Sequence, residues 1–318
     1  MDILNIFDKL DQVEILFEPI YSADEHSIVA YEVIGRIVDK DSAINIEAFT
    51  YKEEEPEDIR AEVEQLVVRK AIELALHEIE SIDLYISCNP NLLMMDFGES
   101  YFSLLKELIP ENQLQHITLV MNEHLFKGDI KHLHHVVKYI KTYGVKVALA
   151  NIGEHSQLES ILMLEPSVLN INVSQLNYNK WGNQNHVFTT LRTLAFKMGA
   201  SLMVSGIDTI YQLQHGWKNG ARYYKGAYLE RPSKSFIPRD TLKPRFRDEC
   251  KQFIATEKKL IKHKLEEIKL LEKNIISSVE QIGPTGSQVE KVMKLAKQLQ
   301  EYAFRLYICD GEGFQTTP

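Results

Sequence analysis

The chain has 318 residues, enough for one large domain and a smaller appendage, and its 44% apolar and 25% charged residues are typical of a folded globular protein. Its formal net charge of −9 argues against nucleic acid or an anionic membrane surface as the main partner. The cysteines Cys88, Cys250 and Cys309 are odd in number and far apart, which excludes a thiolate zinc cluster and fits a reducing compartment.

The N-terminal sequence MDILNIFDKLDQVE carries acidic residues where a secretory signal would carry basic ones, and it has no apolar core segment. No stretch of the chain approaches the roughly 18 uninterrupted apolar residues of a membrane-spanning helix. We therefore expect a cytoplasmic protein with no membrane partner and no nucleic-acid partner.

Short β-rich runs alternate with amphipathic helical segments from residue 13 to about residue 232. Helical spacing of apolar residues marks segments such as 61–79, and Gly144 is placed to end a helix at 128–143. The runs that predict strands are 13–21, 26–37, 83–88, 117–121, 145–150, 168–173, 201–205 and 223–229.

This alternation predicts an α/β fold with a parallel sheet, because parallel strands need crossover connections. Eight strands in about 220 residues fit a (β/α)8 TIM-like barrel. The first two strands are joined only by SADEH, which is too short for a crossover helix, so they should form an antiparallel hairpin. A doubly wound open sheet is the alternative, although no glycine-rich dinucleotide or phosphate loop opens a helix here.

A long helix is predicted from about residue 240 to residue 282, a segment that lacks glycine and is rich in lysine and glutamate. Isoleucine recurs in it every seven residues, although Lys258 and Glu272 interrupt the second apolar position of the heptad. This pattern predicts a coiled coil in a homodimer or a helix docked on a partner. A helix packed back on its own barrel is the alternative. The heptad isoleucines are Ile254, Ile261, Ile268, Ile275 and Ile282.

Gly283-Pro284 should end that helix, and a second short helix is predicted at about 287–302. The run 304–313, FRLYICDGEG, then predicts a strand and a turn with nothing afterwards to pair with. We expect a barrel at 1–235, a connecting helix at 236–283 and the start of a further, incomplete domain at 284–318.

An ordered set of short motifs carries a family resemblance over residues 13–235. The segments are EPI (18–20), YEVIGR (31–36), SCNPNLL (87–93), LVMNE (119–123), LANIG (149–153), LNIN (169–172), VSGID (204–208) and KGAYLERP (225–232). No single segment is specific, but their order and spacing resemble the EAL-type family of cyclic di-GMP phosphodiesterases. The long helix and the run 304–313 resemble the YkuI-like subgroup, in which a PAS-like sensor domain follows.

Active members of the family hydrolyse cyclic di-GMP with two divalent cations, and such hard cations want about six oxygen ligands, largely carboxylates. The resemblance places Glu32 at the glutamate of the EAL motif, where a ligand is retained. Most other ligand and water-handling positions carry apolar or neutral residues, and the last metal glutamate is shortened to aspartate. In chain order these positions are Ser87, Val120, Ala150, Asn151, Asn170, Asn172, Ser205 and Asp208.

Four more positions bear on ligand binding. Arg36 matches an arginine that faces the dinucleotide in the family, and a guanidinium suits phosphate, although pairing with a surface acid explains it as well. Glu123 matches the second glutamate of the ExTE motif, or it caps or salt-bridges at a strand end. Glu18 replaces a glutamine and adds negative charge to a pocket meant for a dianion. Lys225 replaces another glutamine and adds positive charge to the same pocket, which favours a dianion.

Three hypotheses follow from this comparison. The first is a non-catalytic signalling or scaffolding protein, with no catalytic residue, bound metal or cofactor, that dimerises through its helix and binds an unidentified protein partner. The second is a metal-independent receptor for cyclic di-GMP or another nucleotide, with Arg36 and Lys225 as ligand contacts. The third is a residual phosphodiesterase.

Overall fold

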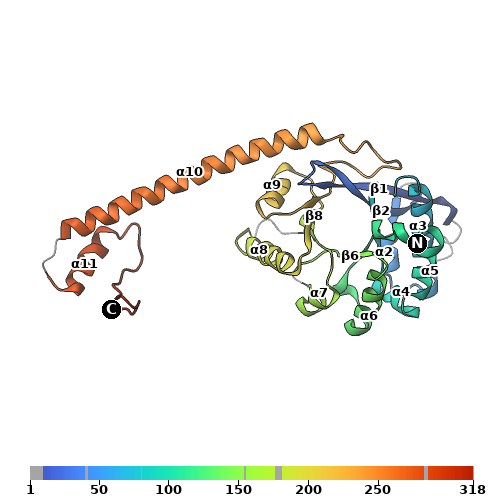
Figure 1. The fold of residues 1–318 in the computed structure, drawn as a ribbon, viewed down its shortest axis with the longest axis horizontal. Coiled ribbons are helices and arrows are strands. Elements are labelled where there is room, and N and C mark those ends of the chain that lie inside the picture. Colours follow the sequence, from blue (N-terminus) through green and yellow to red (C-terminus); the bar gives the residue numbers. More distant parts are fainter. Residues whose placement is uncertain are drawn as a thin grey trace. The chain divides into compact units, whose positions relative to one another are not determined.

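The computed structural model describes residues 10–39, 42–79, 81–153, 155–175, 181–282 and 286–317. The chain divides into two compact units, Met1–Arg247 and Asp248–Pro318. The first unit is a closed ring of strands with helices outside it (Figure 1).

The strands lie close to the predicted runs, and the helices follow them in the expected alternation. The strands are β1 (Val13–Ser22), β2 (Ser27–Asp39), β3 (Ser42–Asn45), β4 (Asp83–Ser87), β5 (Ile117–Met121), β6 (Lys146–Leu149), β7 (Val168–Asn172), β8 (Ser201–Ser205) and β9 (Tyr223–Tyr224). The helices are α2 (Ile46–Thr50), α3 (Glu57–Ala75), α4 (Pro90–Leu93), α5 (Glu99–Leu108), α6 (Ile130–Lys141), α7 (Leu158–Leu164), α8 (Trp181–Met198), α9 (Ile210–Lys218), α10 (Lys243–Ile282) and α11 (Gln288–Gln298).

The sheet closes into a barrel because β1 pairs with both β2 and β9. β1 and β2 are antiparallel, from Val13 opposite Ile37 to Ser22 opposite Ser27. From β2 through β4 to β9, each barrel strand runs parallel to the next. The predicted (β/α)8 TIM-like barrel with an antiparallel first hairpin is therefore confirmed, as is the long helix that follows it. The edge strand β3, antiparallel to β2, was not predicted.

The predicted strand 223–229 is wrong beyond Tyr224. Gly226 has φ +149°, and a Cβ at this position would lie 2.3 Å from the backbone nitrogen of Ile207. Only glycine permits so close an approach of two backbones, so the chain turns here and β9 ends after two residues. Gly144, by contrast, has φ +89° just after α6, as its predicted helix-ending role requires.

Two apolar clusters fill the first unit. The larger one lies between the strands and the surrounding helices. The smaller one takes side chains from the strands that form the ring, and because strand residues alternate between faces it marks the barrel interior. Its buried members are Ile20, Ala30, Tyr85, Val120, Ala148, Ala150, Val168 and Met203.

The second unit contains most of α10, together with α11 and a C-terminal turn. The heptad isoleucines Ile254, Ile261, Ile268 and Ile275 are 37% to 60% exposed. The run 304–313 does not form the predicted strand, and it does have a partner. Cys309 pairs with Gln315 as an isolated bridge, and Thr316 N–H donates to the Ile308 carbonyl, because the chain reverses within the DGEG turn.

Among the described residues, no helix combines the length and the apolarity that crossing a bilayer requires.

Candidate functional site

Polar side chains gather at one end of the barrel interior, where the parallel strands have their carboxyl ends. Each of them lies two residues along its strand from an apolar residue of the barrel interior, so alternation turns it inward as well. In a barrel this end is where side chains from several strands converge. These polar residues are Glu18, Glu32, Ser87, Asn170, Ser205 and Lys225.

Glu18, Glu32 and Lys225 form an ion triad. The two glutamates lie directly opposite each other on β1 and β2, and two like charges in this position repel each other and destabilise the strand pair. The Lys225 ammonium lies 2.8 Å from Glu18 Oε2 and 2.9 Å from Glu32 Oε1, so it offsets part of their mutual repulsion. The three side chains are only 10–13% exposed, so solvent screens this interaction weakly.

Protonation equilibria follow this geometry. Burial lowers the pKa of Lys225, but the charges of Glu32 and Glu18 outweigh burial, and the net pKa lies above that of an ordinary lysine. Burial raises the pKa of Glu32, and the Lys225 charge offsets part of this rise. Glu32 Oε2 is buried and accepts no hydrogen bond from the described residues. The Lys225 ammonium therefore contacts both carboxylates, and Glu32 Oε2 is left without a donor among the described residues.

The remaining strands contribute little charge to the barrel mouth. Val120 and Ala150 are 4% and 6% exposed and belong to the apolar cluster of the interior. Asn170 is equally buried, and within the described part of the chain its Oδ1 has no donor. Ser205 Oγ lies 3.5 Å from the carbonyl oxygen of Ile171. The structure thus places these four predicted positions at the mouth without any carboxylate among them.

A row of amides crosses the ends of β5, β6 and β7. Asn151 Nδ2 donates to Asn122 Oδ1 at 2.8 Å, and Asn172 Nδ2 lies 3.4 Å from Asn151 Oδ1. Asn172 Oδ1 in turn accepts from the backbone N–H and the hydroxyl of Ser174, at 3.1 and 2.7 Å. At the other end, burial raises the pKa of Glu47, and the Lys225 charge and the Asn122 amide offset part of this rise. Asn151 has φ +54°, a conformation that asparagine tolerates better than most residues.

Three predicted residues have other contacts. The Arg36 guanidinium pairs with Glu14 at 3.1 Å across the first hairpin. Glu123 is buried, and its Oε1 accepts the backbone N–H of Gln157, the residue at the N-cap position of α7. Asp208 is exposed at the start of α9, where its own N–H donates to a side chain of that helix.

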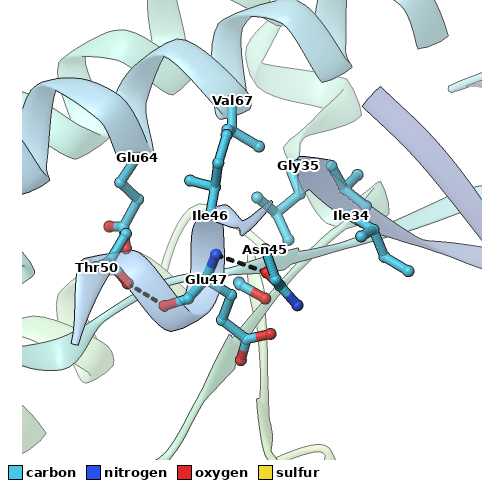
Figure 2. Close-up of a pocket in the computed structure, with 11 residues that line it drawn as sticks. Ile34, Gly35, Asn45, Ile46, Glu47, Thr50, Glu64 and Val67 are labelled. Atoms are coloured by element: carbon cyan, nitrogen blue, oxygen red, sulfur yellow. Dashed lines mark hydrogen bonds between the residues drawn. The ribbon is translucent and has the colours of Figure 1, made fainter. Parts of the chain in front are cut away.

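Glu47 and Glu64 are acidic residues beside the mouth that the sequence analysis missed. They line a cavity of about 30 Å³ between β2, α2 and α3, room for one water molecule. Figure 2 shows the Glu64 side chain extending from α3 beside Thr50, whereas the Glu47 side chain points away from Glu64. Gly35 lets these elements approach, because a Cβ there would lie 2.7 Å from a Val67 methyl group.

Glu64 organises the loops at this corner. Its Oε2 accepts the backbone N–H of Asn89 at 2.9 Å, and Asn89 Nδ2 donates to the Thr50 carbonyl at 2.8 Å. Asn89 Oδ1 also caps α4. Burial, opposed by the Asn89 N–H and supported by the charge of Glu47, raises the pKa of Glu64 to about 8. An acid in the first turns of an amphipathic helix usually faces solvent, so the sequence offered no signal for this buried one.

Oxygen atoms able to bind a metal or a ligand are therefore present but dispersed. In the part of the chain that the structure describes, no three His, Cys, Asp or Glu side chains are grouped closely enough to hold a metal ion. Glu32 is the predicted ligand that remains in place, and it is already paired with Lys225.

Comparisons with known proteins agree with the fold. Residues 4–232 match the EAL domain, and residues 236–318 match the EAL-domain associated signalling protein domain. The EAL-domain containing protein YkuI of Bacillus subtilis strain 168 is 36% identical over 322 residues, which cover 100% of this chain and 79% of that protein.

Solved structures extend this likeness. The crystal structure of B. subtilis YkuI, in complex with substrate c-di-GMP and calcium, superposes with a TM-score of 0.91 at 35% identity, covering 99% of this chain and 79% of that one. The FimX EAL domain of Pseudomonas aeruginosa, bound to c-di-GMP, has a TM-score of 0.60 at 20% identity over 74% of this chain and 98% of that one, which shows the fold alone. The chain belongs to the EAL domain family.

Proposed function

We propose that this chain is a catalytically inactive EAL-domain protein that acts as a non-enzymatic signalling and interaction module in cyclic di-GMP-type signalling. The observation that supports this proposal most directly is the Lys225 ammonium, 2.8 and 2.9 Å from Glu18 and Glu32. A divalent cation bound at Glu32 would lie beside this fixed positive charge, and the two would repel each other.

The residues around the triad fit a two-cation centre poorly. Mg²⁺ takes about six oxygen ligands in a nearly octahedral arrangement, with carboxylates as the usual protein ligands. Val120 and Ala150 offer no ligand atom, and Ser87 and Asn170 offer neutral ones. A mouth without metal is better served by such residues, because clustered carboxylates are costly to desolvate.

Incubation with cyclic di-GMP and Mg²⁺ or Mn²⁺ tests this proposal, with the linear dinucleotide separated by chromatography. We expect no product at any cation concentration, while an active EAL enzyme under the same conditions serves as the positive control. Metal-dependent product that disappears in Glu32→Ala would refute the proposal.

A metal-independent receptor for cyclic di-GMP is the second candidate. The solved YkuI structure, at 35% identity, contains c-di-GMP together with calcium, which favours binding of the dinucleotide but not its independence of metal. The two cationic side chains expected to contact the ligand argue against this candidate, because both are already paired with acids. The Arg36 guanidinium is paired with Glu14, and the Lys225 ammonium is paired with two glutamates. Calorimetric titration with cyclic di-GMP, in EDTA and in Mg²⁺, decides between the two. Binding that persists in EDTA establishes the receptor, and absence of heat in both buffers excludes it.

The module acts, in our proposal, as a homodimer that binds an unidentified protein partner. Isoleucine recurs in α10 every seven residues, and the other apolar position of the heptad follows four residues later, which is the step from position d to position a; it is occupied by Lys258, Leu265, Glu272 and Val279. This period favours a coiled coil between copies of the helix. The first four isoleucine side chains of this series are 37–60% exposed, so a second copy of the helix would bury them. Lys258 and Glu272 lie on the same seam, so the coil should be weak without further contacts.

Ile261→Asp with Ile268→Asp tests the dimer by light scattering, with Lys259→Asp at an outer position of the same helix as the control. We expect the double variant to have the mass of one chain and an unchanged melting temperature. An unchanged mass with a lower melting temperature would instead show that the helix packs within its own chain.

A further inference from the structure

The residue immediately before each member of the ion triad is aromatic. Phe17 precedes Glu18, and Tyr31 and Tyr224 precede the other two. Because strand residues alternate, the triad faces the barrel interior while the three aromatic rings face outward into the larger apolar cluster. Phe17 is 1% exposed, and the two tyrosines are fully buried.

A single segment covers these rings. We call residues 233–247, which lead from β9 to α10, the connector. Within it Phe236 packs against Phe17 and Tyr31, with ring centroids 4.4 and 4.8 Å apart. The Tyr31 hydroxyl donates to the Ile237 carbonyl and accepts the Ile237 N–H, both at 3.1 Å. Phe17 and Ser233 exchange backbone hydrogen bonds of 2.8 and 3.1 Å.

The far end of the connector contacts the third ring. Phe246 lies in the first turn of α10 and is 1% exposed. Its ring centroid lies 6.2 Å from that of Tyr224, 6.3 Å from that of Tyr21 and 5.3 Å from that of Trp217. The first turn of α10 is thereby packed onto β9 and β1, the strands that lead into Lys225 and carry Glu18.

We propose that the connector is a positioning element for the ion triad, and that it links the state of α10 to the barrel mouth through Phe236 and Phe246. Close-packed interiors transmit a displacement instead of absorbing it. The two contacts of Lys225 are hydrogen bonds, which are lost when donor and acceptor separate by about 0.8 Å more. A small shift of β1 or β9 under the connector therefore changes which glutamate Lys225 holds. This inference rests on the proposed role of the triad as the charge centre of the mouth.

Chemical labelling of Lys225 tests the link in the full chain. Reductive methylation needs a neutral, accessible amine, so Lys225 should react far more slowly than the exposed Lys234. Phe246→Leu loosens the packing on β9, and we expect it to accelerate labelling of Lys225 about tenfold or more, equivalent to about 1.4 kcal/mol of local opening free energy. Phe102→Leu on α5 is the matched control, since that ring is 5% exposed and lies outside the connector's contacts.

Global destabilisation would accelerate labelling in both variants, so rates are compared at denaturant concentrations that give equal stability. Equal acceleration by Phe246→Leu and Phe102→Leu under these conditions overturns the proposal. The reverse measurement applies even if Phe246→Leu folds poorly, because coupling is reciprocal. Lys225→Met should speed amide hydrogen exchange in residues 236–247 more than in α5, where only its global destabilisation acts, and equal acceleration in the two segments also overturns the link. Neither measurement requires cyclic di-GMP, so its result is separate from the test for hydrolysis.

Discussion

Replacing Lys225 by methionine removes the ammonium and keeps an unbranched side chain of similar length. Glu18 and Glu32 are then left opposite each other, with side chains 13% and 12% exposed and no cation between them. Breaking a buried ion pair by removing one partner costs about 3–5 kcal/mol, because an uncompensated charge stays buried. We expect a loss of this size in the free energy of unfolding at pH 8.

The pH dependence of this loss identifies its origin. Burial already raises the pKa of Glu32 in the native protein and the Lys225 charge lowers it, so removal of Lys225 raises this pKa further. Stability of Lys225→Met should therefore fall, relative to the native protein, as pH rises from the Glu32 pKa of the native protein to the higher Glu32 pKa of the variant, by up to about 1.4 kcal/mol per pH unit.

Urea unfolding at pH 4.5, 6 and 8 measures this difference. Lys234→Met is the matched control, since Lys234 pairs with Glu14 at 2.7 Å but its side chain is 67% exposed. We expect no measurable effect from it, because solvent screens exposed pairs. Equal stability of the two variants at pH 8 would refute the reasoning and would mean that water reaches the triad freely.

Glu64→Gln should stabilise the protein, because the Glu64 pKa of about 8 lies above the unfolded value and stability is lost between about pH 4.5 and 8. The gain should grow over that window to the order of 5 kcal/mol and level off above it. Curves of stability against pH that stay parallel for the two proteins would contradict this prediction. Val120→Glu with Ala150→Asp should restore no hydrolysis of cyclic di-GMP and should lower the melting temperature, since an unpaired buried acid costs several kcal/mol or protonates. An unchanged melting temperature at pH 8 would show that the mouth is more solvated than its 4% and 6% exposures indicate.

The barrel could be predicted because its signals are local. Alternation of strands and helices, and the short link between the first two strands, need only neighbouring residues and a rule about crossovers. The strand predicted at 223–229 failed because the end of β9 depends on the approach of Gly226 to Ile207, a contact set by the closed barrel. The edge strand β3 is only four residues long and leaves no alternation to detect.

The site was harder to predict because pairing is long-range. The motifs indicated that Glu18 and Lys225 belong to one pocket, but not that their charged atoms meet at 2.8 Å across 207 residues of sequence. Two roles stayed open for Arg36, binding of a phosphate and pairing with an acidic neighbour. Only the register of the first hairpin shows that this neighbour is Glu14. No sequence pattern identified Glu47 as a residue beside the barrel mouth, because the direction of its side chain depends on how α2 lies against β2 and α3.

The row of amides at the mouth has a fixed polarity. Its first donor is the Ser174 backbone N–H, which cannot accept, so Asn172 must present its carbonyl to Ser174 and its N–H to Asn151. Asn151 must in turn donate to Asn122 Oδ1, and neither amide can flip without losing bonds on both sides. The aligned dipoles favour the charged form of Glu47 beside Asn122, against the burial that raises the pKa of this carboxyl group, much as the N-terminal peptide groups of a helix favour an anion. An aspartate at position 172 could not donate, and it would separate Asn122 and Asn151 from the source of their orientation.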